Sequence, residues 1–377
     1  MVYVLKHFDT DLIKFSAESG AEMNIEVLWF NESKAKLFPL DLAEVSAKGI
    51  ESWLKHRTVP KNRAYVDNLL SSMGLSINRP LDVIKVSKGL SLNDCYWVCE
   101  EGSTDTFDAV NLYDNRFSRV LSQIAFTGYG SSNISAITTS PEFTTNGMLP
   151  KCWCRVSGKI LLYKGGTEGF SNTGNEPYSE FYASQIAKAL EVNAIDYKLA
   201  RFKGRICSTC ELFTSKEVSF VPVGRIVRTG GMAAVKEYYR SLGKKYTEQL
   251  NDMFLLDAVI MNADRHFGNF GFLVDSKTNK IIAPAPLFDH GNSLLNFAGR
   301  DVLENFEALE KYSKTILPRV YDDFFAEIKP LLTHRQKNNL RKLLTFKFKK
   351  NARYNLDDNR LKMLEKIIQN RAKELLD

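Results

Sequence analysis

Residues 261–275 read MNADRHFGNFGFLVD, and residues 286–291 read PLFDHG. Acidic, imidazole and amide side chains therefore gather on two short segments that both contain glycine. A hydrophobic core does not require such a cluster, because Asp, His and Asn are seldom buried for packing alone. Capping of the backbone in a turn explains one or two of these residues at most. The pattern therefore favours a chemical role over a structural one.

The spacing of three polar residues indicates which chemistry this is. Asp264 is followed five residues later by Asn269, and Asp289 lies beyond a predicted hairpin that turns at residues 277–280. Magnesium prefers oxygen ligands and is usually held by one or two protein groups plus phosphate oxygens. Kinase folds build such a site from an Asn and a second Asp. We expect Asn269 and Asp289 to hold Mg²⁺, and Asp264 to accept or orient the proton of an attacking hydroxyl.

A nucleotide site needs further parts upstream of this cluster. Lys164 ends the predicted strand ILLYK, sixteen residues before Glu180 in the following helix. A strand lysine paired with a helix carboxylate is the usual way to hold α- and β-phosphates. The segment TTNGMLPK at 144–151 leads into the first strand of a hairpin predicted at 152–164. Its position favours a nucleotide loop, although a plain turn is the alternative.

Length and periodicity predict a two-lobed α+β architecture. The 377 residues are enough for two or more domains. Residues 1–80 are expected to form a small N-terminal α/β subdomain, with a strand at 23–30 and helical spacing at 47–75. Residues 81–213 are predicted to form a β-rich lobe, and residues 214–377 a helical lobe.

Composition also narrows the classes of protein. The N-terminal stretch shows no signal peptide or lipidation site, and no apolar run reaches the length of a membrane helix. The six cysteines lack zinc-site spacing and are expected to be reduced thiols of a cytoplasmic protein.

The formal charge of +7 is concentrated in residues 333–354, which contain no acid. Such a basic strip can meet a nucleic acid, a membrane or an acidic protein. We favour the solvated face of a helix, with four apolar side chains facing inward: Leu340, Leu343, Leu344 and Phe348.

The motifs together resemble the HipA-like serine/threonine kinases of bacteria. The resemblance rests, in chain order, on NGMLPK at 146–151, EFYASQIAKAL at 180–190, CELF at 210–213, NADRHFGN at 262–269 and PLFDHG at 286–291. The DRHxxN string also resembles phosphoinositide kinases, which share the remote protein-kinase fold.

The resemblance implies ATP and Mg²⁺ as cofactors and assigns further roles. His266 would approach the ATP phosphates and assist Asp264 in catalysis, and Lys164 would bind the same phosphates. Glu211 and Phe213 would lie at the hinge, where backbone groups meet adenine. The nucleotide loop would contribute Asn146, Gly147, Met148 and Lys151. In family members this loop carries an autophosphorylated hydroxyl a few residues before its glycine, where this chain has Thr144 with Thr145 beside it.

Departures from the family leave its biology open. Residues 1–80 match no family element, and no helix-turn-helix or other nucleic-acid motif is visible, so an antitoxin would be a separate partner. Whether the protein is a toxin is therefore open. The leading hypothesis is a kinase of Ser/Thr hydroxyls in a protein substrate. The alternative is a lipid-headgroup or small-molecule kinase, for which the basic strip would be the membrane-facing element. A non-enzymatic protein on a degraded kinase fold is disfavoured, because every essential position is filled.

Overall fold

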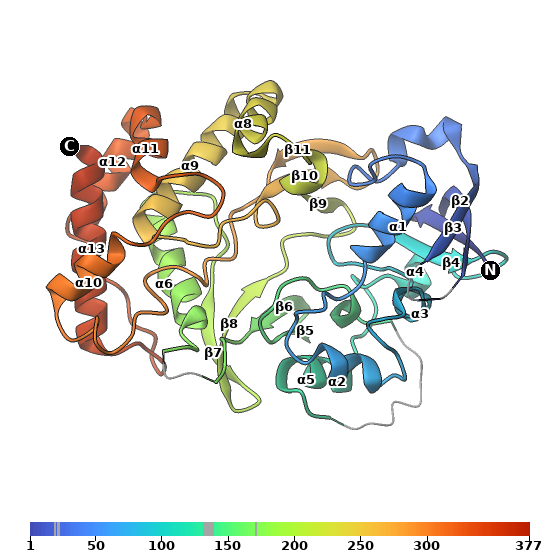
Figure 1. Ribbon diagram of the computed structural model, residues 1–377, viewed down its shortest axis with the longest axis horizontal. Helices are drawn as coiled ribbons and strands as arrows, with labels where there is room; N and C mark the ends of the chain where they lie inside the picture. Colours follow the sequence, from blue (N-terminus) through green and yellow to red (C-terminus); the bar gives the residue numbers. More distant parts are fainter. Residues whose placement is uncertain (19, 21–22, 131–138, 170–171) are drawn as a thin grey trace. The chain divides into compact units, whose positions relative to one another are not determined.

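A computed structural model of the chain describes residues 1–18, 20, 23–130, 139–169 and 172–377 (Figure 1). The fold combines antiparallel sheets with many helices, which confirms the predicted α+β class. Contacts within the chain separate two compact units. Unit 1 consists of Met1–Lys164, Glu211–Val221 and Phe272–Ala283, and unit 2 consists of Gly165–Cys210, Pro222–Gly271 and Pro284–Asp377.

Unit 1 begins with a four-stranded antiparallel sheet in the order β3-β2-β1-β4. Its strands are β1 (Val2–His7), β2 (Thr10–Glu18), β3 (Asn24–Phe30) and β4 (Tyr96–Glu100). Strand β3 confirms the predicted strand at 23–30. Apolar side chains of α1, among them Ile50 and Trp53, share a buried core with this sheet. Because β4 pairs with β1, the sheet takes its fourth strand from beyond residue 80. The three-part division of the chain stays a prediction.

Short helices occupy the rest of unit 1, and of these η1, α1 and α3 contact the sheet. The short helices are η1 (Glu32–Leu37), α1 (Ala47–Lys55), α2 (Val66–Ser71), α3 (Pro80–Ser87), α4 (Phe107–Val110), α5 (Arg119–Thr127) and η2 (Pro141–Phe143). The helical spacing at 47–75 therefore belongs to two helices, α1 and α2. Figure 1 shows α1 beside β3.

Both predicted hairpins are present. The first joins β5 (Lys151–Val156) to β6 (Lys159–Lys164) through Ser157 and Gly158. Both turn residues have positive φ, 50° and 80°, as the tightest hairpin turns require. The second joins β10 (Gly271–Asp275) to β11 (Lys280–Pro284), and β9 (Val218–Pro222) completes a sheet in the order β11-β10-β9.

Unit 2 is mostly helical. Its elements are α6 (Glu176–Ala189), the antiparallel pair β7 (Lys198–Phe202) and β8 (Arg205–Glu211), α7 (Val223–Ile226), α8 (Gly231–Leu242), α9 (Lys244–Ile260), α10 (Phe306–Ser313), α11 (Phe324–Ile328), η3 (Lys329–Leu331), α12 (His334–Leu343) and α13 (Asp358–Leu376). Helix α9 is buried throughout its last turns and packs against α6, α8, α11 and α13. The long C-terminal helix α13 runs beside α12 (Figure 1).

Four of the eight cations in the basic strip at 333–354 form ion pairs within unit 2. Its ion pairs are Arg335–Asp252 at 2.7 Å, Lys342–Glu191 at 2.7 Å, Lys347–Glu365 at 2.8 Å and Lys350–Asp358 at 2.6 Å. Leu340, Leu343 and Phe348 are buried as expected. Leu344 is 39% exposed, so its predicted inward position is wrong. It follows the last residue of α12, where the helix ends and the apolar stripe no longer faces the core. The paired cations agree with a solvated helix face.

Two other expectations from composition can be compared with the structure. The cysteines are all free thiols. Over the residues that the structure describes, no helix has both the length and the apolar character needed to cross a membrane.

Candidate active site

The polar loop at 262–270 begins where helix α9 ends. Met261 adopts a left-handed conformation with φ 56°, and Asn262 then ties the loop to the helix. The Asn262 side chain donates to Asp257 Oδ1 at 3.1 Å and accepts from the backbone N–H of Asp264 at 3.1 Å. The abrupt stop of α9 therefore places Asp264 on a short bend, where its side chain is partly exposed.

Arg265 holds this loop to the segment that carries Asp289. Its guanidinium and the carboxylate of Asp257 are both fully buried and form two bonds of 2.9 Å each. The same guanidinium donates to the backbone carbonyl of Phe288 at 2.7 Å and contacts that of Asn269 at 3.3 Å. One buried side chain thus connects the candidate catalytic loop with the candidate metal loop inside unit 2.

His266 and Asn269 lie on the same bend. The Nδ1 atom of His266 accepts from the N–H of Gly268 at 3.1 Å, which leaves the ring proton on Nε2. Burial lowers the pKa of His266, while the carboxylates of Asp264 and Asp289 oppose that shift. The imidazole is therefore neutral at pH 7, so it is suited to donate one hydrogen bond but not to supply a full positive charge.

Asn269 is nearly buried and offers an amide oxygen. Its Nδ2 atom donates toward the carbonyl of Asp264 at 3.4 Å, and its backbone N–H donates to the carbonyl of His266 at 2.9 Å. The Asn269 side chain is therefore oriented by the loop that carries Asp264. With the amide nitrogen used inside the loop, the carbonyl end of the side chain is the end suited to a cation.

Asp289 has a left-handed backbone with φ 59°, which Asp tolerates better than most residues. Its N–H donates to the hydroxyl of Tyr197 at 3.1 Å. The next N–H, from His290, donates to Oε2 of the fully buried Glu180 at 2.9 Å. Glu180 was predicted to pair with Lys164. Within unit 2, Glu180 supports the backbone of the metal loop. Lys164 belongs to unit 1, and its pairing with Glu180 stays a prediction.

Asp264 has a second neighbour that the sequence did not indicate. Arg319, from the segment between α10 and α11, forms an ion pair with its Oδ1 atom. Both side chains are partly exposed, so the pair is well hydrated and easily broken. The Asp264 carboxylate can therefore be released from Arg319 at little energetic cost.

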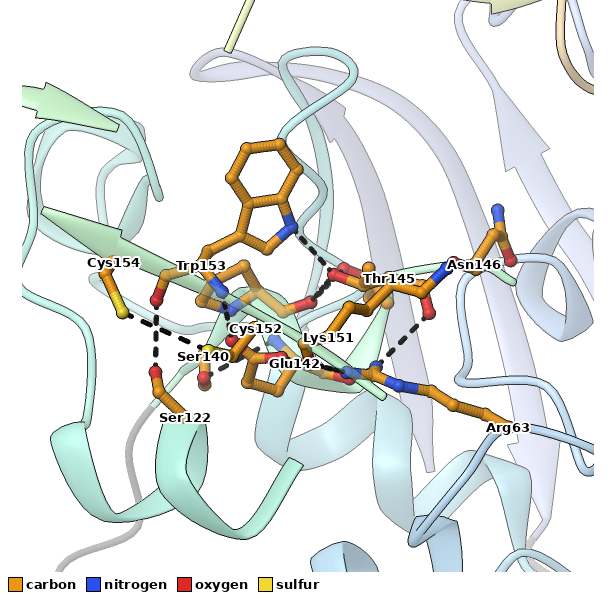
Figure 2. Close-up of polar contacts among 12 residues, drawn as sticks. Arg63, Ser122, Ser140, Glu142, Thr145, Asn146, Lys151, Cys152, Trp153 and Cys154 are labelled. Atoms are coloured by element: carbon orange, nitrogen blue, oxygen red, sulfur yellow. Dashed lines mark hydrogen bonds and ion pairs between the residues drawn. The ribbon is translucent and has the colours of Figure 1, made fainter. Parts of the chain in front are cut away.

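The candidate nucleotide loop at 144–151 belongs to unit 1, and its threonines are hydrogen-bonded to residues on either side of it in the sequence (Figure 2). The buried Thr144 hydroxyl donates to the carbonyl of Leu90 at 2.7 Å. The Thr145 hydroxyl donates to the carbonyl of Pro141 at 2.7 Å and accepts from the indole N–H of Trp153 at 3.1 Å. Both autophosphorylation candidates thus have engaged hydroxyls, so the loop must open before either one is modified.

Lys151 and Gly147 fit each other in this loop. The Lys151 ammonium is buried and donates to the carbonyl of Asn146 at 2.9 Å. A Cβ atom added at Gly147 would lie 2.2 Å from Lys151 Nζ, and Gly147 has φ 95°. The positive φ favours glycine here, and the lysine ammonium fills the space that a larger side chain would need. Asn146, Gly147 and Met148 form the exposed tip, and their contact with a nucleotide stays a prediction.

The two predicted hinge residues follow strand β8. Glu211 forms an exposed ion pair with Lys159 at 2.5 Å, and the ring of Phe213 packs edge-on against Phe220 at 5.4 Å. Leu212 between them donates its N–H to the carbonyl of Ile160 at 2.9 Å. The segment is thus anchored to β6. Its contact with adenine stays a prediction.

The donor set suits magnesium better than a softer metal. Asn269 and Asp289 contribute an amide and a carboxylate, both hard oxygen ligands. In the described parts of the chain, no three His, Cys, Asp or Glu side chains are grouped as a metal cage. Mg²⁺ in kinases needs no such cage, because phosphate oxygens complete its coordination.

Known proteins resemble the chain over part of its length or over almost all of it. No protein-family model matches the chain. The serine/threonine-protein kinase CtkA of Helicobacter pylori is 26% identical over 153 residues, which cover 36% of this chain and 47% of that protein. The chain thus matches about half the length of this curated relative. The crystal structure of the H. pylori proinflammatory kinase CtkA covers 62% of this chain and 90% of its own, with 17% identity and a TM-score of 0.49.

The HipA structure from Shewanella oneidensis MR-1, solved with HipB and operator DNA as a toxin–antitoxin system, covers almost the whole chain. It matches 99% of this chain and 97% of its own, with 14% identity and a TM-score of 0.54. The two-lobed kinase-like fold that the motifs predicted is therefore confirmed. The chain has the fold of the HipA-like serine/threonine kinases, and its resemblance to them is confirmed.

Proposed function

We propose that the chain is an ATP- and Mg²⁺-dependent kinase that transfers the γ-phosphate to Ser or Thr hydroxyls of a protein. The observation that carries the proposal is the buried Arg265, which bonds the carbonyls of Asn269 and Phe288 and so keeps the two polar loops of unit 2 together. The similarity to the kinase CtkA supports the same conclusion.

Each side chain has a defined part in the proposed reaction. Asp264 accepts the proton of the attacking hydroxyl and orients it. His266, neutral at pH 7, donates a hydrogen bond from Nε2 toward a phosphate oxygen. Asn269 and Asp289 would hold Mg²⁺, which would supply charge neutralisation at the phosphates. Lys151 and Lys164 would contribute positive charge from unit 1.

The buried position of Lys151 is consistent with a phosphate-binding loop. Its ammonium is already bonded to the carbonyl of Asn146, so it stiffens the loop as well as charging it. We propose Thr144 or Thr145 as the site of autophosphorylation in this loop. Adding close to two negative charges beside Lys151 would oppose ATP binding, so modification would switch the enzyme off. A separate regulatory protein, corresponding to the antitoxin, remains part of the proposal.

The proposal is tested by incubating the purified protein with labelled ATP and MgCl₂ and mapping phosphate by mass spectrometry. Phosphate on Ser or Thr, absent from the Asp264→Asn protein, supports it. Absence of any transfer to itself, to a protein extract or to casein, with no ATP binding in calorimetry, contradicts it. Transfer to phosphoinositide vesicles or small alcohols, with none to protein, would favour the lipid or small-molecule alternative. That alternative is weakened, though only in part, by the ion pairs that four of the eight cations in the basic strip form.

A further inference from the structure

A dipeptide of the N-terminal region, Arg63-Ala64, binds the candidate nucleotide loop along its whole length. The Arg63 Nη1 atom donates to the carbonyls of Glu142 at 2.7 Å and Thr145 at 3.3 Å. The N–H of Ala64 donates to the carbonyl of Met148 at 2.8 Å. The Arg63 Nη2 atom donates to the carbonyl of Lys151 at 2.8 Å. Every third carbonyl from 142 to 151 is therefore held by one short segment.

A buried carboxylate completes this contact (Figure 2). Glu142 Oε2 pairs with Arg63 Nη2 at 3.0 Å, and its Oε1 accepts from the N–H of Trp153 at 2.8 Å. Both charged side chains are almost completely buried. Burial raises the pKa of Glu142, and the Arg63 guanidinium and the Trp153 N–H oppose that shift. Glu142 precedes the loop and Trp153 lies in the strand after it, so the pair connects the two ends of the loop.

The geometry explains why a buried ion pair occurs here. Burying two charges is costly, and such a pair often stabilises a fold no better than apolar residues would. An exposed loop of eight residues, by contrast, has carbonyls that no secondary structure satisfies. The planar guanidinium offers five donors in fixed directions. Here it bonds two carbonyls of the loop, those of Thr145 and Lys151, and the carbonyl of Glu142 just before it. The arrangement therefore fixes the shape of the loop more than it adds stability.

We propose that Arg63 is a positioning residue that, with Glu142 and Ala64, pre-shapes the nucleotide loop for ATP. This gives the N-terminal region, which matches no motif of the kinase family, a part in nucleotide binding through the loop that it holds. The inference rests on the proposed function, because it assumes that the 144–151 loop contacts ATP. If the loop is shaped correctly only part of the time, the apparent Kd for ATP rises in inverse proportion to that fraction.

A second buried pair in the same unit provides a matched control. Arg57 lies six residues before Arg63, pairs with Asp94 at 2.5 Å, and donates to the carbonyls of Gly89 and Tyr96 at 3.0 and 3.4 Å. None of these partners belongs to the nucleotide loop. Arg57→Lys and Arg63→Lys therefore make the same chemical change at two buried sites of one unit. Each removes the planar set of guanidinium donors and keeps the positive charge.

The test compares the parent, Arg63→Lys, Arg57→Lys and Glu142→Gln as full-length proteins. Hydrogen exchange is measured on peptides that cover 141–152, and ATP·Mg affinity is measured by calorimetry. We expect Arg63→Lys to accelerate exchange in the loop and to raise the Kd by roughly tenfold or more, while Arg57→Lys changes both by less than about twofold. Glu142→Gln keeps an acceptor for the Trp153 N–H and should give an intermediate effect, which preserves the test if Arg63→Lys fails to fold.

The results distinguish failure of the positioning role of Arg63 from failure of the proposed function. Unchanged loop exchange in both Arg63→Lys and Glu142→Gln, or an equal rise in Kd in Arg63→Lys and Arg57→Lys, overturns the positioning role. A parent protein that does not bind ATP·Mg at all overturns the proposed function instead. In that case the exchange data alone decide whether Arg63 shapes the loop.

Discussion

Replacing Arg265 by Met tests whether one buried side chain organises the candidate site of unit 2. The substitution keeps much of the side-chain length and removes the charge and all donors. It leaves the Asp257 carboxylate, which is fully buried, without its guanidinium. It also removes the donor from the carbonyls of Phe288 and Asn269. The candidate catalytic and metal loops then lose the contact that joins them.

The magnitude follows from the burial of the pair. Removing one partner of a buried ion pair costs about 3–5 kcal/mol, because an uncompensated charge stays inside. In a cooperative unit of roughly 150–250 residues, 1 kcal/mol shifts the Tm by about 2–4 °C. We therefore expect Arg265→Met to lower the Tm by about 6–20 °C. The double variant Arg265→Met/Asp257→Leu should recover at least about half of that loss, since no buried charge remains.

The assay is thermal unfolding followed by circular dichroism, with Arg319→Met as the control. Arg319 also pairs with an aspartate of unit 2, but both partners are partly exposed, and such pairs contribute about 0–1 kcal/mol. The Tm of the Arg319→Met protein should stay within about 3 °C of the Tm of the parent. Equal Tm values for Arg265→Met and Arg319→Met would refute the reasoning. A double variant that is no more stable than Arg265→Met would show that the stranded Asp257 charge is not the cause.

Three further predictions address chemistry and stability. Asp264→Asn should slow phosphoryl transfer by roughly 10²–10⁴ and leave the ATP Kd within about threefold, because a general base acts mainly in the transition state; near-normal turnover in a quenched-flow assay would exclude the role. Asp289→Asn should weaken ATP·Mg binding in calorimetry without lowering the Tm, and equal affinity would remove this residue from the metal site. Burial lowers the pKa of His7 from 6.5 to about 4. Between these two pH values the folded protein therefore binds fewer protons than the unfolded chain. Its unfolding free energy should fall as the pH drops from 6.5 to 4, by at most about 1.4 kcal/mol per pH unit in the middle of that range. His7→Phe should show a shallower fall in urea titrations.

Features decided by neighbouring residues were predictable from the sequence. The Ser157-Gly158 turn has the two positive φ values that its short loop requires, and the alternating strands around it leave little choice of register. The same holds for the hairpin that leads to Asp289. Helix α9 has a long apolar pattern that ends just before the polar loop, so Asp264 was expected on a bend. In each case a pattern of a few residues carries the physical cause.

Features decided by distant partners were not predictable. Arg63 and Glu142 are 79 residues apart, and nothing near either residue reveals that the other neutralises it. Tyr197 reads as an isolated aromatic residue, yet its hydroxyl accepts the N–H of Asp289, 92 residues away. Strand β4 pairs with β1, although the paired residues His7 and Tyr96 are 89 positions apart in the sequence. These residues can be found in a single sequence, but their partners cannot, because contacts between distant residues depend on the tertiary structure.

Three buried arginines have the same set of partners, and this set explains why they lie next to loop backbone. Arg57, Arg63 and Arg265 each bind one carboxylate and at least two backbone carbonyls. A carbonyl in a loop cannot rely on a helix or strand for a donor, and an arginine has donors to spare but no acceptor to satisfy. The carboxylate offsets the charge that this solution introduces, although at a desolvation cost that apolar packing would avoid. Lysine would keep the charge and lose the fixed directions. A buried charge is therefore found where the shape of a loop has to be fixed, despite its desolvation cost. Two of the three arginines, Arg63 and Arg265, contact the loops that are proposed to bind ATP and magnesium.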